Sequence, residues 1–144
     1  MMTSGFVCFS VVPLLFQVAQ ATEDGGQTFS VFLSGNGGYD MFRIPALLAV
    51  DERVLLAFAE GRKKGLGDSG DIDIVLRRSV DGGESWEPMR VVWDDSVNTC
   101  GNPCVVWDAD TRTVWLLLTW NAGDDDEQRI IAGKSPTGRR VFVT

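Results

Sequence analysis

The chain contains no histidine. This absence excludes a Ser-His-Asp or Cys-His catalytic group, because an imidazole takes the proton from the nucleophile in both. It also excludes a histidine-ligated metal site. Only two cysteines, Cys100 and Cys104, follow the apolar N-terminal segment, and two thiols alone cannot complete a structural zinc site. We therefore expect no metal and no cofactor.

Positive charge is also scarce. The 144 residues include 13 Lys and Arg against 20 Asp and Glu, which gives a net charge of −7. A surface that binds nucleic acid or an anionic membrane needs an excess of Lys and Arg. The composition therefore argues against both as partners.

Residues 1–21 carry no charged side chain and precede an abrupt change in composition. Phe6–Phe16 is apolar, and Ala19-Gln20-Ala21 has the small-x-small form of a signal-peptidase site. The segment lacks an N-terminal Lys or Arg, and a membrane anchor is the alternative, although a span needs about 20 apolar residues. We expect a signal peptide over 1–21, one domain over 22–144, and a secreted or periplasmic protein whose contact with the membrane ends with export.

Export would permit a disulfide between Cys100 and Cys104. Only Gly101-Asn102-Pro103 separates them, and so tight a loop needs favourable Cβ directions. A disulfide and two packed thiols both remain open.

Short runs of Val, Ile, Leu, Phe and Trp alternate with turn residues along the rest of the chain, and no stretch has helical periodicity. This pattern predicts an all-β fold. The expected strands are Phe29–Leu33, Arg43–Val50, Val54–Ala59, Ile72–Arg78, Met89–Trp93, Cys104–Trp107, Val114–Trp120, Arg129–Gly133 and Val141–Thr144. The turns between them include Asp51-Glu52-Arg53 and Asp108-Ala109-Asp110.

An internal repeat narrows the choice among β folds. An apolar strand that begins at Pro45, a polar turn and a second apolar strand recur from Pro103, 58 residues later. A repeat of this length indicates propeller blades. We expect about two blades, which is fewer than a closed propeller needs.

The segment Ser79–Trp86 fits the Asp-box pattern S-x-D-x-G-x-[ST]-W, with Ser79, Asp81, Gly83 and Trp86 at its defining positions. Such a turn lets the Asp side chain accept backbone N–H groups and gives Gly a conformation that other residues resist. We interpret this motif as structural, at the rim of a blade and away from any central pocket.

Phe42-Arg43-Ile44-Pro45 upstream of an Asp-box resembles the bacterial exo-α-sialidases, from about Phe29 to Thr144. The resemblance implies a six-bladed β-propeller, of which this chain would hold the N-terminal part, and terminal sialic acid on glycans as substrate. It also implies that Arg43 binds the sialic acid carboxylate, which suits a permanently charged, bidentate guanidinium.

The Gly-rich segment Glu60–Ile74 resembles the sialidase loop with the catalytic acid/base, which assigns that role to Asp68. A carboxylic acid can protonate the leaving oxygen and, once ionised, activate water. Asp71 and Asp73 are the competitors, but they alternate with isoleucines and favour a structural role. The resemblance also places Arg62 close to the ligand.

Weaker support comes from Asn102, in the Asn-Pro-Cys of the second repeat, which the resemblance places near the ligand, with a simple turn as the alternative. Lys63, Lys64 and the acidic run 124–127 are expected to be solvated, with a calcium site at the acidic run as an alternative.

Sialidases retain configuration and use a tyrosine nucleophile, which lies in a later blade of the family. The only tyrosine here, Tyr39, stands in another motif. We therefore expect the chain to hold part of an exo-α-sialidase site without its nucleophile. The alternative is a non-catalytic Asp-box propeller that binds glycans or proteins.

Overall fold

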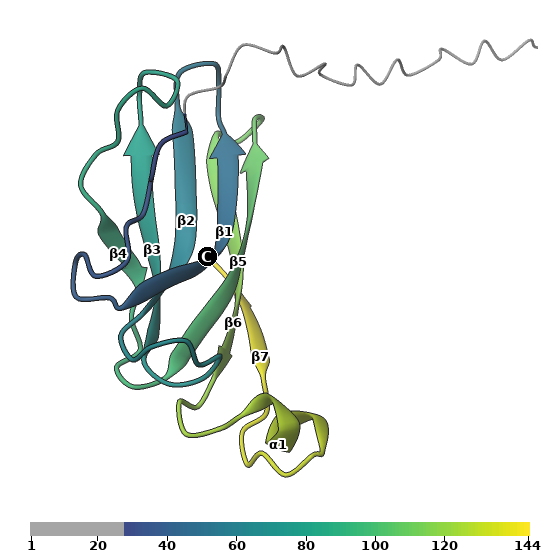
Figure 1. Ribbon diagram of the computed structural model, residues 1–144. Helices are drawn as coiled ribbons and strands as arrows, with labels where there is room; N and C mark the ends of the chain where they lie inside the picture. The colour runs from purple at the N-terminus through teal and green to yellow at the C-terminus, as the bar shows by residue number, and fades with distance from the viewer. Residues whose placement is uncertain (1–27) are drawn as a thin grey trace, which may run out of the picture.

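The computed structural model describes residues 28–144, so the expected signal peptide over 1–21 lies outside the described residues. Strands dominate this part of the chain (Figure 1). The elements are β1 (Met41–Ala49), β2 (Leu55–Arg62), β3 (Ile72–Ser79), β4 (Arg90–Trp93), β5 (Thr99–Asp108), β6 (Thr113–Asn121), α1 (Glu127–Ile131) and β7 (Arg140–Val143). In the described residues, no helix is both long and apolar enough to cross a membrane.

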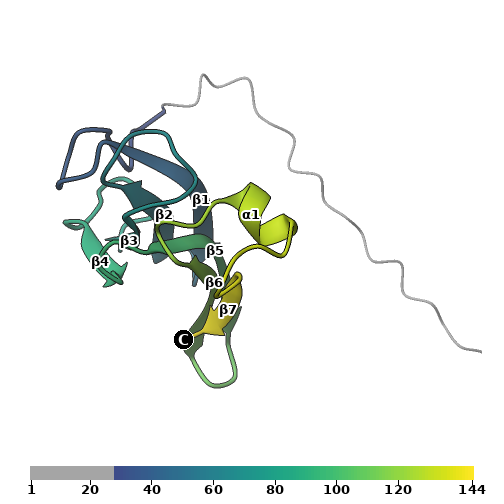
Figure 2. The same cartoon turned by 90° about the horizontal axis from the view of Figure 1, so that it is seen from below.

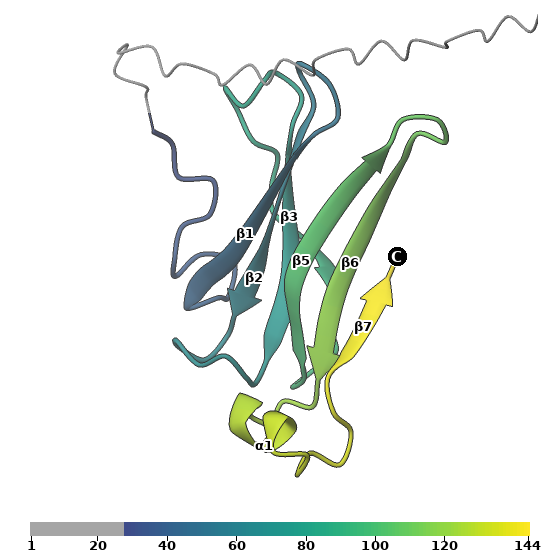
Figure 3. The ribbon, with the colours of Figure 1, turned by 90° about the vertical axis from the view of Figure 1, so that its right-hand side faces the viewer.

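The strands form two antiparallel units. The first unit is β1-β2-β3-β4 and the second is β5-β6-β7. They are joined by one parallel pairing, between Ile72 at the start of β3 and Thr99 at the start of β5. Beyond this point the two units diverge (Figure 3). The all-β prediction is confirmed, and the open sheet consists of about two propeller blades.

The main hydrophobic core fills the space between the units. Phe58 of β2 and Ile74 of β3 pack with Cys100 of β5 and with Leu116 and Leu118 of β6. Each of these side chains is almost fully buried. Burial of one such apolar side chain contributes about 1.5–3 kcal/mol, so this cluster holds the two units against each other.

The opposite face of the first unit has a second, smaller core. Because side chains alternate along a strand, Ala59 and Val75 point away from the main core. Tyr39 packs on them from the segment before β1. The ring of Tyr39 lies over Gly61, where a Cβ would approach the ring within 2.7 Å. Glycine at this position therefore lets Tyr39 cover β2.

The repeat seen in the sequence has a structural counterpart. The register of β1 shifts between Arg43 and Ala46, and that of β5 shifts between Gly101 and Cys104. Each bulge contains a proline, which cannot donate to a β ladder. The residue before each proline has a positive φ, 51° at Ile44 and 54° at Asn102. Such a φ is rare for a β-branched residue and is typical of functional segments.

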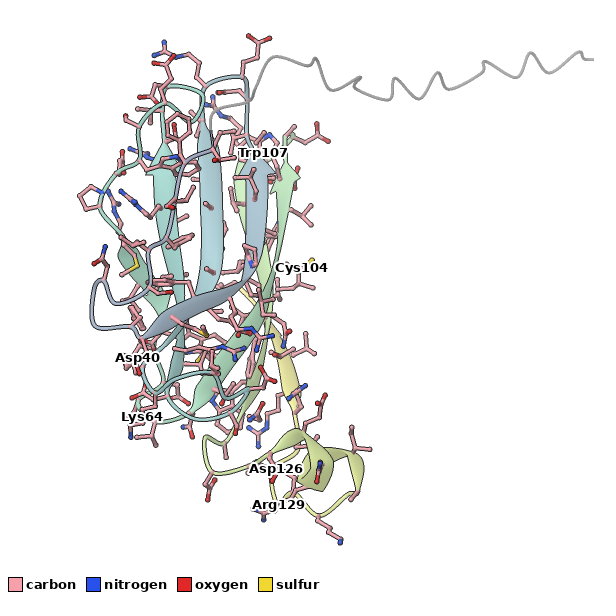
Figure 4. All side chains as sticks on the ribbon, in the orientation of Figure 1. Asp40, Lys64, Cys104, Trp107, Asp126 and Arg129 are labelled. Atoms are coloured by element: carbon pink, nitrogen blue, oxygen red, sulfur yellow. The ribbon has the colours of Figure 1, made fainter. Side chains whose placement is uncertain are left out.

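Two of the predicted strands are wrong. Phe29–Leu33 forms bends instead of a strand and leads into turns at Gly35, Gly37 and Gly38, which all have positive φ. Arg129–Gly133 falls mostly in α1, because the Asp126 side chain caps the helix by accepting the N–H of Arg129. Figure 4 labels both of these residues at α1. The N-cap signal was present in the sequence.

Two other strands extend further than predicted. β2 continues through Glu60 to Arg62, and β5 begins at Thr99 instead of Cys104. Polar residues and glycine made both segments resemble loops. Both are strands because their ladder pairs continue, Glu60 with Ile74 and Gly101 with Thr119.

The two cysteines of β5 are both free. Cys100 is buried in the main core, and burial raises the pKa of its thiol to about 12. Cys104 is exposed on the side of β5, beyond the bulge (Figure 4). The structure therefore contains neither of the two arrangements left open by the sequence, a disulfide or a pair of packed thiols.

The Asp-box forms the turn between β3 and β4. Asp81 accepts hydrogen bonds from the backbone N–H and the hydroxyl of Ser85 and from the hydroxyl of Ser79. These bonds, led by the Ser85 hydroxyl, hold the pKa of Asp81 well below its usual range. Trp86 is half-buried. The turn lies beside Arg53, whose carbonyl accepts the Gly82 N–H, at the end of the strands opposite α1 (Figure 1).

Candidate functional site

A polar cavity of about 240 Å³ lies where β2 and β6 end and β5 begins. This is the lower end of the strands in Figure 1, and Figure 2 looks onto it. The lining residues come from both units: Arg43, Ile44, Glu60, Arg62, Asp68, Thr99, Asn102, Thr119, Asn121, Glu127 and Arg139. All four residues predicted to act on a ligand, Arg43, Arg62, Asp68 and Asn102, therefore converge on one cavity.

A larger cavity of about 500 Å³ has less suitable chemistry. Its lining is mainly apolar, with Phe32, Phe42 and Met89, and Arg77 is the one charged side chain among the described residues that line it. The Arg77 guanidinium already donates to three backbone carbonyls. The smaller cavity is therefore the better candidate site, because the charged side chains of Arg43 and Asp68 are open to it.

Arg43 and Asp68 form an exposed ion pair in the site. Nη1 of Arg43 donates to Oδ1 of Asp68 at 2.8 Å, and the side chains are 43% and 70% exposed. Arg62 donates to the same oxygen, also at 2.8 Å. The hydrogen bond from Arg62, aided by the charges of Arg62 and Arg43, lowers the pKa of Asp68 below its usual value. Asp68 is therefore a carboxylate at neutral pH in this state.

Arg62 differs from Arg43 because its side chain is only 3% exposed. Its Nε and Nη2 donate to one oxygen of Glu60, at 3.1 and 2.6 Å. Its Nη1 donates to the backbone carbonyls of Leu66 and Gly67 and to Asp68. Burial alone would lower the pKa of Arg62, but the bonds to Glu60 and Asp68 outweigh it and raise that pKa. The guanidinium thus ties β2 to the loop that carries Asp68.

Asn102 enters the site through the bulge of β5. Its backbone N–H donates to Glu60 at 2.9 Å, and its side-chain amide donates to the hydroxyl of Thr119 at 2.8 Å. Asn102 is exposed, so the amide oxygen remains available to a ligand. The positive φ of Asn102 is better tolerated by asparagine than by most residues.

Several other residues that line the cavity were not expected from the sequence. Glu60 is buried within β2, although its segment was expected to be a loop. Arg139 and Glu127 come from the region around α1, and Nε of Arg139 donates to Asn121 at 3.3 Å. The sequence around these residues does not indicate a ligand site, because only the fold brings them to the cavity.

The competing aspartates lie elsewhere. Asp73 is fully buried on the other face of the first unit, where the Tyr39 hydroxyl donates to it at 2.6 Å. Nζ of Lys63 lies 2.9 Å from both Asp71 and Asp73. The structural interpretation of the two aspartates is confirmed, and the expectation that Lys63 is solvated is wrong. Burial, and then the bond to Asp73, raises the pKa of Tyr39 strongly.

The acidic run 124–127 is exposed as expected at Asp124, Asp126 and Glu127, but not at Asp125. Asp125 is buried, 3.7 Å from Arg129, and Asp126 caps α1. In the described residues, no three acidic or cysteine side chains are grouped so that they could hold a metal ion.

Comparison with known proteins identifies relatives of the chain. An exo-alpha-sialidase of Aspergillus fumigatus is 42% identical over 95 residues, which cover 62% of this chain and 23% of the relative. Sialidase-3 of Bos taurus is 35% identical over 108 residues, 71% of this chain and 25% of the relative. The chain is related to the sialidases. No protein-family model matches it.

The solved structures include a sialidase with the same arrangement of strands. The chain superposes on the Hadza microbial sialidase Hz136 with a TM-score of 0.65 and 25% identity, over 76% of this chain and 24% of that sialidase. The sequence motifs resemble those of bacterial sialidases, and the relatives also include fungal and mammalian sialidases. The chain spans about a quarter of the length of its relatives from Aspergillus fumigatus and Arthroderma benhamiae.

Proposed function

We propose that the cavity is part of the site of an exo-α-sialidase that removes terminal sialic acid from glycans by a retaining mechanism. The observation that carries this proposal is the contact between Arg43 and Asp68 at the mouth of a cavity that also holds Arg62 and Asn102. A half-exposed guanidinium suits the carboxylate of the sugar, and an exposed carboxyl beside it suits proton transfer to the glycosidic oxygen.

The roles of Arg43, Asp68 and Arg62 follow from how exposed each side chain is. Arg43 binds the sugar carboxylate, because its guanidinium is open to the cavity. Asp68 is the acid/base, and Arg62 holds its loop from beneath. When the sugar carboxylate forms two hydrogen bonds with the Arg43 guanidinium, it displaces the Asp68 carboxylate from Arg43. That exchange raises the pKa of Asp68 toward the value that a general acid needs, since only Arg62, and no longer Arg43, then stabilises the carboxylate.

The proposal extends to the protein that contains this chain. Residues 22–144 form the first part of a six-bladed propeller domain, and residues 1–21 direct the protein to export as a signal peptide. Sialylated glycans outside the cell or in the periplasm are its substrates. Support comes from the sialidase relatives and from the apolar, uncharged character of the first 21 residues.

Binding of N-acetylneuraminic acid to the chain tests the site directly. In an NMR titration we expect the Arg43 and Asn102 signals to shift at millimolar concentrations of the sugar. Binding should be this weak because one open arginine supplies only part of the carboxylate binding. Arg43→Gln should abolish these shifts, since it removes the charge. The neutral N-acetylmannosamine, which lacks the carboxylate, should cause none.

Arg53→Gln is the matched control, because Arg53 is an exposed arginine in the turn at the opposite end of the strands. It should leave the titration unchanged. Shifts that persist in Arg43→Gln, or that appear equally with the neutral sugar, would contradict the proposed site.

The 144-residue chain alone should release no measurable product from a fluorogenic sialoside. Its only tyrosine, Tyr39, is buried and hydrogen-bonded to Asp73, away from the cavity. Without a nucleophile the covalent route of a retaining sialidase is closed. Turnover by the chain above that of the heat-denatured sample would show that another residue acts as nucleophile.

A further inference from the structure

Glu60 is a buried carboxylate at the boundary between the two units. Its side chain is 5% exposed, and it projects from β2 toward the start of β5. A buried charge is retained only where hydrogen bonds and an opposite charge compensate its lost hydration. The partners of Glu60 therefore define what it holds in place.

One carboxylate oxygen, Oε2, accepts two hydrogen bonds from Arg62. This pair fixes the plane of the guanidinium, so that Nη1 points at the loop and reaches Leu66, Gly67 and Asp68. The link from Glu60 to Asp68 thus runs through a single arginine side chain. Charge-assisted, bidentate contacts of this kind have strict geometry.

The other oxygen, Oε1, accepts the backbone N–H of Asn102 in the second unit. Gly101, just before it, makes room for the carboxylate: a Cβ on Gly101 would come within 2.7 Å of Oε1. The bond holds the N–H of a residue whose φ is 54°. Glu60 therefore also fixes the bulge that presents the Asn102 side chain to the cavity.

We infer that Glu60 is a positioning residue that couples the two halves of the site, because it sets Arg62, and through it the Asp68 loop, in register with the Asn102 bulge. This inference concerns the same cavity as the proposed function, and the role of Glu60 in catalysis rests on that proposed function. Its test needs no substrate, so its failure can be told apart from a failure of the sialidase proposal.

The decisive experiment compares Glu60→Gln with wild type by NMR. The substitution keeps the shape of the side chain and removes one of two acceptor oxygens. We expect the Asn102 amide to exchange with solvent about tenfold faster or more, as loss of a charge-assisted bond implies. The Arg62 Nε–H signal should shift and broaden in the same variant.

The pKa of Asp68 separates positioning from charge. If Glu60 acted only through its charge, its removal would lower the pKa of Asp68 further, because a nearby negative group disfavours a second one. If Glu60 positions Arg62, its removal weakens the bond from Arg62 to Asp68 and raises that pKa toward its ordinary value. A rise supports the inference, and a fall or no change overturns it.

Glu87→Gln is the control, because Glu87 is also paired with an arginine, Arg78, but lies away from the cavity. It should leave the Asn102 and Asp68 signals unchanged. If Glu60→Gln does not fold, Gly101→Ala provides the second test, since its Cβ displaces the Glu60 carboxylate with the charge intact. The same rise in the pKa of Asp68 is expected, and its absence would overturn the inference.

Discussion

Replacing Asp68 with alanine in the complete protein that contains this chain should lower the release of sialic acid from sialyllactose by about 10²–10⁴-fold, the usual contribution of a general acid/base. The carboxyl lies within 2.8 Å of Arg43 at the mouth of the cavity, so the glycosidic oxygen of a sugar bound to Arg43 comes within its reach. The measurement is kcat/KM on purified protein.

Two substrates with different leaving groups provide a more specific test of Asp68 as the acid. An aryl sialoside has an acidic leaving group that needs little protonation, so Asp68→Ala should slow its cleavage less than that of sialyllactose. Asp110→Ala, in an exposed turn at the far end of the strands, is the control and should leave both rates unchanged. Equal losses on both substrates would show that Asp68 does not act as the acid.

The two ion pairs of Asp68 also bear on the pH dependence of catalysis. Its pKa is depressed in the free site, chiefly by the bond from Arg62. A lowered pKa keeps the group ionised even at the acidic pH where an ordinary aspartate becomes protonated, whereas proton donation requires the protonated form. Displacement from Arg43 by the substrate carboxylate therefore matters, and turnover should increase toward acidic pH.

Local patterns in the sequence predicted much of the fold. Alternating apolar residues marked most strands, and the turns at Asp51 and Asp108 form as expected, with each carboxylate accepting two backbone N–H groups. The repeat of Pro45 and Pro103 corresponds to two equivalent bulges. These features depend on residues close together in the chain, which is why they can be read from it.

The missed features depend on partners far apart in sequence. Glu60 looked like a loop residue because a carboxylate in a central strand is expected only where a buried cation meets it. Its cation, Arg62, was expected to contact the ligand instead. The contact with Asn102 spans 42 residues and two units. The sequence thus predicted four of the residues that meet at the site, Arg43, Arg62, Asp68 and Asn102, but not that Glu60 supports them.

Lys63 illustrates the same point on the other face of the first unit, and its removal should have the largest effect on stability. Its ammonium group lies 2.9 Å from Asp71 and Asp73 and 3.5 Å from Asp94. These bonds outweigh burial and raise the pKa of Lys63, while burial raises that of Asp73. Asp73 is fully buried, and Oδ1 of its carboxylate has no hydrogen-bond partner among the described residues. Lys63, which contacts Oδ2, therefore supplies the charge that compensates the buried carboxylate.

Lys63→Met should therefore lower the free energy of unfolding by about 3 kcal/mol at neutral pH, because it leaves a buried carboxylate without its cation. The loss should shrink as the pH falls through the raised pKa of Asp73, since the protonated acid no longer needs a cation. Urea unfolding followed by circular dichroism measures both effects. Lys64→Met, at an exposed neighbour, should change stability by less than about 0.5 kcal/mol.

The double variant Lys63→Met with Asp73→Asn completes the test. Removing both charges leaves no uncompensated ion at the fully buried position 73, so only the more exposed Asp71 and Asp94 lose their cation, and the asparagine oxygen can still accept the hydrogen bond of the Tyr39 hydroxyl. The double variant should therefore be more stable than Lys63→Met alone, with a coupling free energy of about 1–3 kcal/mol at neutral pH once Asp73→Asn alone completes the cycle. Additive losses would mean that Lys63 stabilises the fold through its packing on Tyr39, 6.0 Å from the ring centre, and not through its charge.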